Sequence, residues 1–165
     1  MLNPIPSEVD VAVIGAGSAG LPAFRAAREH TDRVILIERG PHGTTCARVG
    51  CMPSKLLIAA AEAAHGMEIA PGFGIHPGSI SIDGEAVMER VRRERDRFVG
   101  FVLDGVDRID PEQKISGQAR FVEDSRLEIG NSQVRAGRVV IASGTSPAIP
   151  DFLEQVRDRV SVNDD

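Results

Sequence analysis

The chain has 165 residues, which is enough for one domain with its own hydrophobic core and short for two. Its formal net charge of −5 and its lack of Trp and Tyr argue against a nucleic-acid-binding surface. No apolar run approaches the ~20 residues that span a bilayer, and residues 1–7 lack the basic start and apolar core of a signal peptide. These features predict a cytoplasmic protein that binds neither nucleic acid nor membrane.

The N-terminal quarter of the chain has the order strand, glycine turn, helix, strand. Residues 9–14 form an almost continuous apolar run, which is typical of a strand buried on both faces. Residues 18–30 predict a helix with alanines along one face, and residues 34–37 predict a second buried strand that is closed by Glu38. Together these elements predict a right-handed βαβ unit.

The rest of the chain predicts two helices followed by short strands. Residues 54–67 are rich in Ala, Leu and Ile, and Asp83 is expected to cap a long helix that ends near residue 106. Three short antiparallel strands are expected at residues 114–122, 126–129 and 133–136, and a final buried strand at residues 139–142. The predicted fold class is therefore α/β, with a Rossmann-like parallel sheet and a small antiparallel β insertion.

Three glycines follow the first strand with the spacing of a dinucleotide-binding turn. Gly15 allows a tight bend, Gly17 lets the backbone approach a pyrophosphate, and Gly20 lets the helix pack closely on the strand. The free N–H groups at the start of the helix would then face the phosphates. Glu38 closes the next strand, where a carboxylate can accept both hydroxyls of an adenosine ribose. The alternative is a tight turn that binds nothing.

Cys46 and Cys51 are the only cysteines in the chain, and three uses are open to them. Buried apolar cysteines would not need Gly50 and Pro53 beside them, and two sulfurs without further ligands do not make a metal site, so none is predicted. A redox pair would gain from the start of a helix and from Lys55, because both positive charges lower a thiolate pKa. Spacing alone does not decide between redox and structural use.

The segment 43–55, GTTCARVGCMPSK, resembles the signature G-G-x-C-x-N-x-G-C-x-P-S-K of the class I pyridine nucleotide–disulfide oxidoreductases. This family includes dihydrolipoamide dehydrogenase, glutathione reductase and mercuric reductase. The resemblance extends over the chain, through the glycine turn, Glu38, residues 117–121 and residues 141–147. It implies the N-terminal part of an FAD-binding domain.

Two residues depart from that signature. Thr44 replaces its second glycine, and Arg48 replaces its usual asparagine. We expect Thr44 to restrict the backbone before Cys46. We expect the charge of Arg48 to influence the thiolate pKa or the choice of substrate.

The resemblance also implies roles for individual residues. Cys46 would attack the substrate disulfide, and Cys51 would lie nearer the flavin, with Lys55 approaching the flavin ring. The residues that match the cofactor-binding positions of the family are Gly15, Gly17, Ser18, Gly20, Glu38, Arg39, Thr45, Cys46, Lys55, Gly117, Ala119, Ala142, Ser143 and Gly144.

The implied domain organisation is that of an incomplete enzyme. Residues 1–150 would be the N-terminal segment of the FAD-binding domain, and residues 151–165 would begin a linker to a nicotinamide-binding domain that holds NAD(P). A complete protein would be a homodimeric FAD-dependent disulfide oxidoreductase. The 165-residue chain alone is expected to be inactive.

Among substrates the favoured expectation is dihydrolipoamide, oxidised with NAD, which would make a 2-oxo acid dehydrogenase complex a partner. The alternatives are a mercuric or glutathione reductase, acting on a small-molecule substrate, and a nucleotide-binding module without catalysis whose cysteines serve as a thiol switch.

Overall fold

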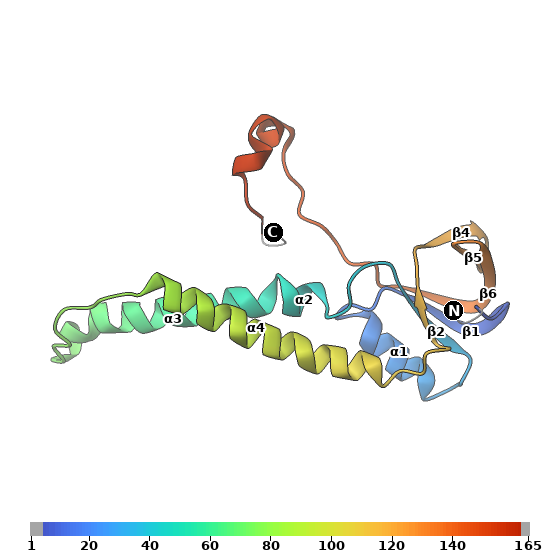
Figure 1. Ribbon diagram of the computed structural model, residues 1–165, viewed down its shortest axis with the longest axis horizontal. Coiled ribbons are helices and arrows are strands. Elements are labelled where there is room, and N and C mark those ends of the chain that lie inside the picture. Colours follow the sequence, from blue (N-terminus) through green and yellow to red (C-terminus); the bar gives the residue numbers. More distant parts are fainter. Residues whose placement is uncertain (1–4, 163–165) are drawn as a thin grey trace.

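The structure is a computed structural model that describes residues 5–162. Residues 1–4 of the expected FAD-binding segment and residues 163–165 of the expected linker lie outside the described residues. The described chain contains a six-stranded sheet with the strand order β3-β2-β1-β6-β5-β4 (Figure 1). The strands are β1 (Glu8–Ile14), β2 (Val34–Glu38), β3 (Lys114–Ser116), β4 (Ala119–Glu123), β5 (Arg126–Ile129) and β6 (Ser132–Ile141).

The parallel half of the sheet is built around β1. This strand pairs in parallel with β2 on one side and with β6 on the other, and β2 pairs in parallel with β3. The side chains of Ala12, Val13 and Leu36 have no exposed surface, as expected of strands that are covered on both faces. The predicted α/β fold class and the βαβ unit are confirmed.

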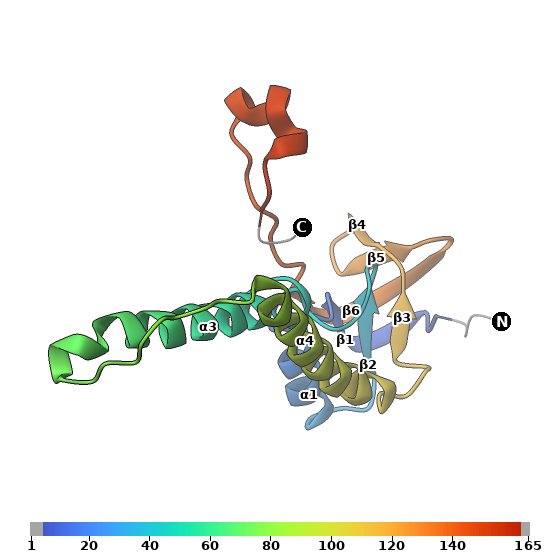
Figure 2. The same ribbon diagram turned by 60° about the vertical axis from the view of Figure 1, so that its left-hand side comes forward.

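Different elements cover the two faces of the sheet (Figure 2). One face packs on α1 (Gly20–Arg28) and on the C-terminal end of α4 (Gly84–Asp107), with Phe24 and Val106 in the shared core. On the other face, residues of β1 and β2 pack against the antiparallel end of the same sheet. Leu127 and Ile129 of β5 belong to this second core cluster. This arrangement leaves the carboxyl ends of β1, β2 and β6 free to form a site.

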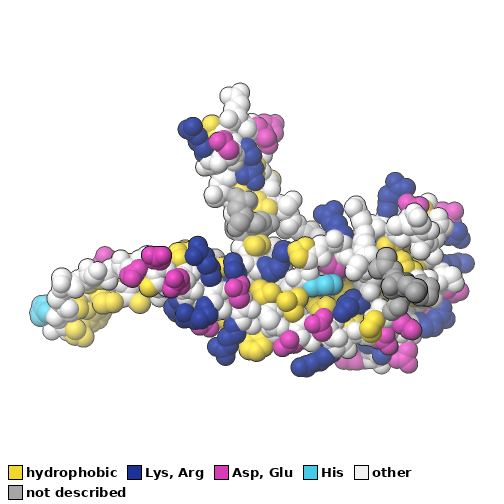
Figure 3. All heavy atoms as spheres, in the orientation of Figure 1, with side chains coloured by type: hydrophobic (Ala, Val, Ile, Leu, Met, Phe, Trp, Pro, Cys, Tyr) yellow, Lys and Arg dark blue, Asp and Glu magenta, His cyan; other side chains and the backbone are white. Residues whose placement is uncertain are grey.

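A long helical hairpin extends away from the sheet (Figures 1 and 2). After the short helix α2 (Thr45–Arg48), α3 (Cys51–Ile69) runs outward, a turn of 3₁₀ helix (Ala70–Phe73) follows, and α4 runs back. The carboxylate of Asp83 accepts a hydrogen bond from the Ala86 backbone N–H at 3.0 Å, so the predicted cap of α4 is confirmed. No residue of α3 is buried, and Figure 3 shows hydrophobic side chains exposed along the hairpin. Within residues 5–162 no helix combines the length and apolar character needed to cross a membrane.

The C-terminal part of the described chain leaves the sheet after β6. A further segment of 3₁₀ helix (Asp151–Arg159) contains no buried residue and stands away from the rest of the fold (Figure 1).

Two expectations about strands were wrong. Residues 114–122 do not form one antiparallel strand: β3 extends the parallel sheet, and the chain turns at Gly117 before β4 begins. Residues 133–136 and 139–142 do not form two strands, because β6 runs continuously to Ile141 and changes from an antiparallel partner, β5, to a parallel one, β1. The end of β6 is not buried either. Ile141 is 68% exposed, because β5 pairs only with the first residues of β6 and this edge has no neighbour within the described chain.

Replacement of Gly20 by alanine is expected to destabilise the fold by about 3 kcal/mol, because the added methyl group would overlap the carbonyl oxygen of Gly15. Gly66→Ala is the matched control, since Gly66 lies inside α3 with no atom within 4 Å of the added carbon. It should stabilise the protein by ~0.5–1 kcal/mol. Urea unfolding measures both, and a Gly20→Ala variant as stable as the wild type would contradict this packing of α1 on the turn.

Candidate functional site

A cleft of about 520 Å³ lies at the carboxyl ends of the parallel strands. In sheets of this kind ligands bind where successive connections leave in opposite directions, and β1, between β2 and β6, marks that point. The cleft is lined by residues that follow four strands and by the segment that leads into α2. These are residues 14–17, 37–41, 44, 45, 48, 117–119 and 142–146.

The glycine turn brings two backbone segments together at the floor of the cleft. Gly15 has φ +102°, its N–H donates to the Ile37 carbonyl at 2.7 Å, and a side chain there would overlap the carbonyl of Ala142. The Ala142 N–H in turn donates to the Ile14 carbonyl at 2.8 Å. Gly17 differs, because no atom lies within 4 Å of the position its side chain would take. The turn is thus closely packed on the protein side and open beside Gly17.

Glu38 ties the end of β2 to this turn. Its Oε2 accepts the Ala16 N–H at 2.7 Å and its Oε1 accepts the Gly40 N–H at 2.8 Å. Partial burial raises the pKa of Glu38, but the hydrogen bonds from the backbone of Ala16, Gly40 and Arg39, together with nearby His42, outweigh it and lower the pKa overall. The group is therefore a carboxylate, and each oxygen retains acceptor capacity for a ligand hydroxyl.

Thr44 holds the entry to the dithiol segment. It is buried, and its backbone has φ 60° and ψ 144°, a region that β-branched residues rarely occupy. Its hydroxyl accepts the Ala47 N–H at 3.0 Å and so caps α2. Thr44 therefore adopts a conformation suited to the glycine of the family signature, and the helix cap compensates part of the cost.

The two cysteines lie on consecutive helices as free thiols. Cys46 belongs to α2 and is half-buried, whereas Cys51 is the first residue of α3 and is exposed. Gly50 connects them, with its N–H on the Thr45 carbonyl at 2.9 Å and its carbonyl accepting the Ser54 hydroxyl at 2.9 Å. The redox reading required a helix to start at the pair, and α3 does start there.

The expected lowering of the thiol pKa was wrong for Cys46. A hydrogen bond to the Cys51 sulfur, burial and the charge of Cys51 raise the pKa of Cys46, and they outweigh the hydrogen bonds from the Cys51 backbone and the Ser18 hydroxyl, which lower it. Arg48 is not among the groups that shift the pKa of Cys46. The contact with Ser18 nevertheless joins the dithiol to the glycine turn.

The structure places most of the predicted cofactor residues on the wall of the cleft and a few elsewhere. The residues that do not line the cleft are four: Gly20 packs beneath the turn, Ser18 and Cys46 interact with each other, and Lys55 is exposed on α3. The predicted residues that line the cleft are Gly15, Gly17, Glu38, Arg39, Thr45, Gly117, Ala119, Ala142, Ser143 and Gly144.

Sequence reasoning missed part of the wall. It assigned the N–H groups of the turn to a ligand, but the Ala16 N–H donates to Glu38, and no sequence pattern indicates Gly40 as the second partner of that carboxylate. Arg48, whose charge was expected to influence the thiolate pKa or the choice of substrate, lines the cleft. Of these residues only Arg48 could have been singled out from the sequence, because it replaces the asparagine of the family signature.

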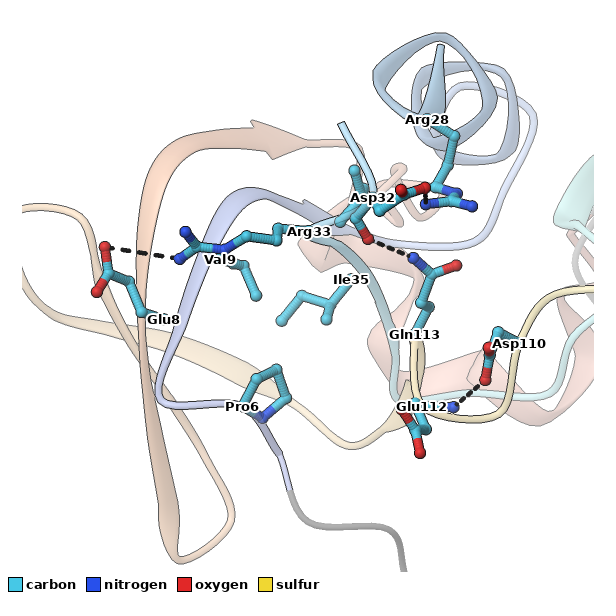
Figure 4. Close-up of a pocket in the computed structure, with 11 residues that line it drawn as sticks. Pro6, Glu8, Val9, Arg28, Asp32, Arg33, Ile35, Asp110, Glu112 and Gln113 are labelled. Carbon is cyan, nitrogen blue, oxygen red and sulfur yellow. Dashed lines mark hydrogen bonds and ion pairs between the residues drawn. The ribbon is translucent and has the colours of Figure 1, made fainter. Parts of the chain in front are cut away.

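A second cavity, of about 500 Å³, is lined by residues at the start of β1 and β2 and just before β3 (Figure 4), which is the end of the sheet opposite to the glycine turn. Its polar groups satisfy one another: Arg33 lies 3.7 Å from Glu8, the Gln113 side chain donates to the Asp32 carbonyl at 2.7 Å, and Arg28 pairs with Asp32. It lies far from the glycine turn and the cysteines. We therefore assign the candidate site to the cleft at the carboxyl ends of the strands.

Comparisons with known proteins agree with this geometry. Residues 9–164 match the family described as pyridine nucleotide-disulphide oxidoreductase. The chain belongs to this family. Its members bind FAD and use NAD(P).

Two relatives illustrate the similarity. The chain is 36% identical over 159 residues to a mercuric reductase of Streptomyces lividans, covering 89% of this chain and 33% of the relative. It is 32% identical over 143 residues to a glutathione reductase of Burkholderia cepacia, covering 87% and 32%. The chain thus spans about one third of the length of the curated relatives it matches.

The fold also matches solved structures. The Cu(II) complex of RclA from Escherichia coli, an HOCl-induced flavoprotein disulfide reductase, superposes with a TM-score of 0.63 at 22% identity, covering 88% of this chain and 31% of that one. At this identity the match concerns the fold.

Glu38→Gln is expected to destabilise the protein by about 1 kcal/mol at neutral pH, because the amide keeps only one acceptor oxygen for the two backbone donors. The folded-state pKa of Glu38 is lowered, so its stabilisation is full above the ordinary glutamate pKa of about 4.3 and is lost as pH falls through the lower folded value. The stability difference should therefore shrink in acid. A difference that is constant from pH 7 to pH 3 in urea unfolding would contradict the assignment.

Cys51→Ala is expected to lower the pKa of Cys46, since the Cys51 sulfur supplies the largest effect that raises it. Ser18→Ala should shift the same pKa in the opposite direction, because the hydroxyl stabilises the Cys46 thiolate. The pH dependence of Cys46 alkylation by iodoacetamide reports both, since the thiolate is the reactive form. Shifts in the same direction in the two variants would refute this description of the dithiol.

Proposed function

We propose that this chain is the N-terminal, FAD-binding part of a flavin-dependent dithiol–disulfide oxidoreductase. The observation that carries the proposal is that the dithiol directly follows the wall of the cleft: Thr44 and Thr45 line the cleft, and Cys46 comes next on α2. A dinucleotide cleft and a pair of thiols therefore form one connected site. Family membership supports the same conclusion.

The residues of the cleft fit the adenine dinucleotide half of FAD. The open space beside Gly17 leaves room for the pyrophosphate, and the Glu38 carboxylate is kept ionised and able to accept ribose hydroxyls. Backbone segments 117–119 and 142–146 would enclose the remainder of the nucleotide. When bound, FAD supplies two-electron transfer between NAD(P)H and the dithiol.

The chemistry of this chain is thiol–disulfide exchange. Following the family pattern, the Cys46 thiolate attacks one sulfur of a substrate disulfide and releases the other as a thiol. Cys51 then attacks Cys46 in the mixed disulfide, which releases the second substrate thiol and leaves a Cys46–Cys51 disulfide. The substrate gains two electrons from the dithiol, and a bound FAD would supply the two electrons that restore it. The hydrogen bond between the two cysteines supports this sequence, because it keeps their sulfurs within reach of each other.

Because the pKa of Cys46 is raised, neighbouring groups must stabilise its thiolate for the reaction to proceed. Attack requires the thiolate, and the Ser18 hydroxyl and the Cys51 backbone are the groups that favour it. We propose that Ser18 acts on the thiol and not on the phosphates of the cofactor, which revises the role expected from the sequence.

For the substrate we propose a compound that the enzyme reduces: a small disulfide such as glutathione disulfide, by the exchange described above, or mercuric ion, which the two thiolates would bind and two electrons from NAD(P)H would reduce to the metal. The similarity to a mercuric reductase and to a glutathione reductase supports reduction, and it gives no support to the initial preference for dihydrolipoamide. Dihydrolipoamide oxidation, with a 2-oxo acid dehydrogenase complex as partner, is the competing proposal.

The organisation of the full protein is also a proposal. We propose that residues 151–165 lead into a nicotinamide-binding domain and that the complete enzyme is a cytoplasmic homodimer. The exposed 3₁₀ segment Asp151–Arg159 supports a linker role, since none of its residues is buried.

The full-length protein tests the function directly. Purified enzyme should carry FAD and should oxidise NADPH or NADH when given mercuric ion or glutathione disulfide. The reverse assay uses dihydrolipoamide with NAD, and activity only there would transfer the assignment to the competing proposal. Cys46→Ser and Cys51→Ser should each abolish turnover while the bound flavin, the control for folding, is retained. Turnover that survives both substitutions would refute the dithiol mechanism, and bound flavin with no turnover of any disulfide would favour a thiol switch.

A further inference from the structure

Arg48 lies in the wall of the dinucleotide cleft, and its buried Nε atom has no hydrogen-bond partner within residues 5–162. It is the last residue of α2 and lines the cleft together with Thr44 and Thr45. Its aliphatic carbons pack against Gly43, where an added Cβ would lie 3.2 Å from Cδ of Arg48. The Nε atom is buried and has no hydrogen-bond acceptor among the described residues. A buried guanidinium N–H without an acceptor is unfavourable, so the arrangement favours an external acceptor.

The surroundings of Arg48 narrow the choice of acceptor. Glu38, the carboxylate that lines the cleft, accepts the backbone N–H groups of Ala16 and Gly40 and makes no ion pair with Arg48. None of the ion pairs found among residues 5–162 includes Arg48. Arg48 is also not among the groups that shift the pKa of Cys46. The guanidinium charge of Arg48 is therefore available to a ligand in the cleft.

We propose that Arg48 is a phosphate ligand of this cleft. The planar guanidinium can offer Nε–H and one Nη–H to two oxygens of a phosphoryl group, a geometry that ribose and adenine do not match. A phosphate beside Gly17 would lie in the open part of the cleft that Arg48 also lines. The proposal rests on the proposed dinucleotide function and adds a cationic contact at a position where the family signature has a neutral asparagine.

Paired ligands test the proposal on the 165-residue chain. ADP and adenosine share the nucleoside and differ in the diphosphate, so a phosphate ligand acts on ADP alone. Arg48→Gln is expected to weaken ADP binding about tenfold or more and to leave adenosine binding within about twofold, as measured by ligand-observed NMR or calorimetry. The ADP affinity of Arg48→Lys should lie between those of the wild type and Arg48→Gln, because lysine keeps the charge and loses the bidentate geometry.

Arg92→Gln is the matched control. Arg92 is exposed on α4, outside the cleft, and its replacement changes the net charge by the same amount. It should leave both affinities unchanged. An equal loss of ADP and adenosine binding in Arg48→Gln and Arg48→Lys, or an unchanged affinity for ADP in both, would overturn the phosphate assignment while the cleft itself stands. If the wild-type chain binds neither ligand, the dinucleotide site, and Arg48 with it, is refuted.

Discussion

The site depends on one hydrogen bond between two strand ends, from the Ala16 N–H to the Glu38 carboxylate. It fixes the turn after β1 against the end of β2, and the close approach of Gly15 to Ala142 fixes the same turn against the end of β6. Three loops that are distant in the sequence thereby form one wall. Because the carboxylate makes two short bonds to backbone donors, it remains ionised although partly buried. The charge that holds the loops together is thus also the charge available to a ligand.

The dithiol is attached to this scaffold through a short strained segment. Thr44 takes a backbone conformation that glycine would adopt more easily, and its side chain caps α2, which carries Cys46. The same turn of helix directs Arg48 to the cleft, so one four-residue helix serves both the thiols and the nucleotide. Strain of this kind is usually kept where the local geometry matters for function. Both departures from the family signature therefore belong to one structural unit: Thr44 caps α2, and Arg48 is the last residue of α2.

The sequence predicted the positions of helices and strands better than it predicted which strands pair with each other. Local patterns identified β1, α1, β2 and the cap at Asp83, because burial on both faces and helix capping leave signals within a few residues. The strand partners of Lys114–Ser116 and of β6 depend on contacts between distant segments, so periodicity could not reveal them. In the site, glycine spacing predicted the cleft, but the bond from Ala16 to Glu38, the raised pKa of Cys46 and the direction of Arg48 arise only from tertiary proximity.

The most direct test of this account is a titration of the isotope-labelled chain with ADP, followed by backbone amide NMR. Binding at the carboxyl ends of the strands should perturb the amides of Gly17, Gly40 and Gly144, which lie in the cleft. The amides of Arg33 and Gln113, in the cavity at the opposite end of the sheet, should not move. Perturbations centred on Arg33 and Gln113, with the glycine turn unchanged, would contradict the central claim that the loops joined by Glu38 form the nucleotide site.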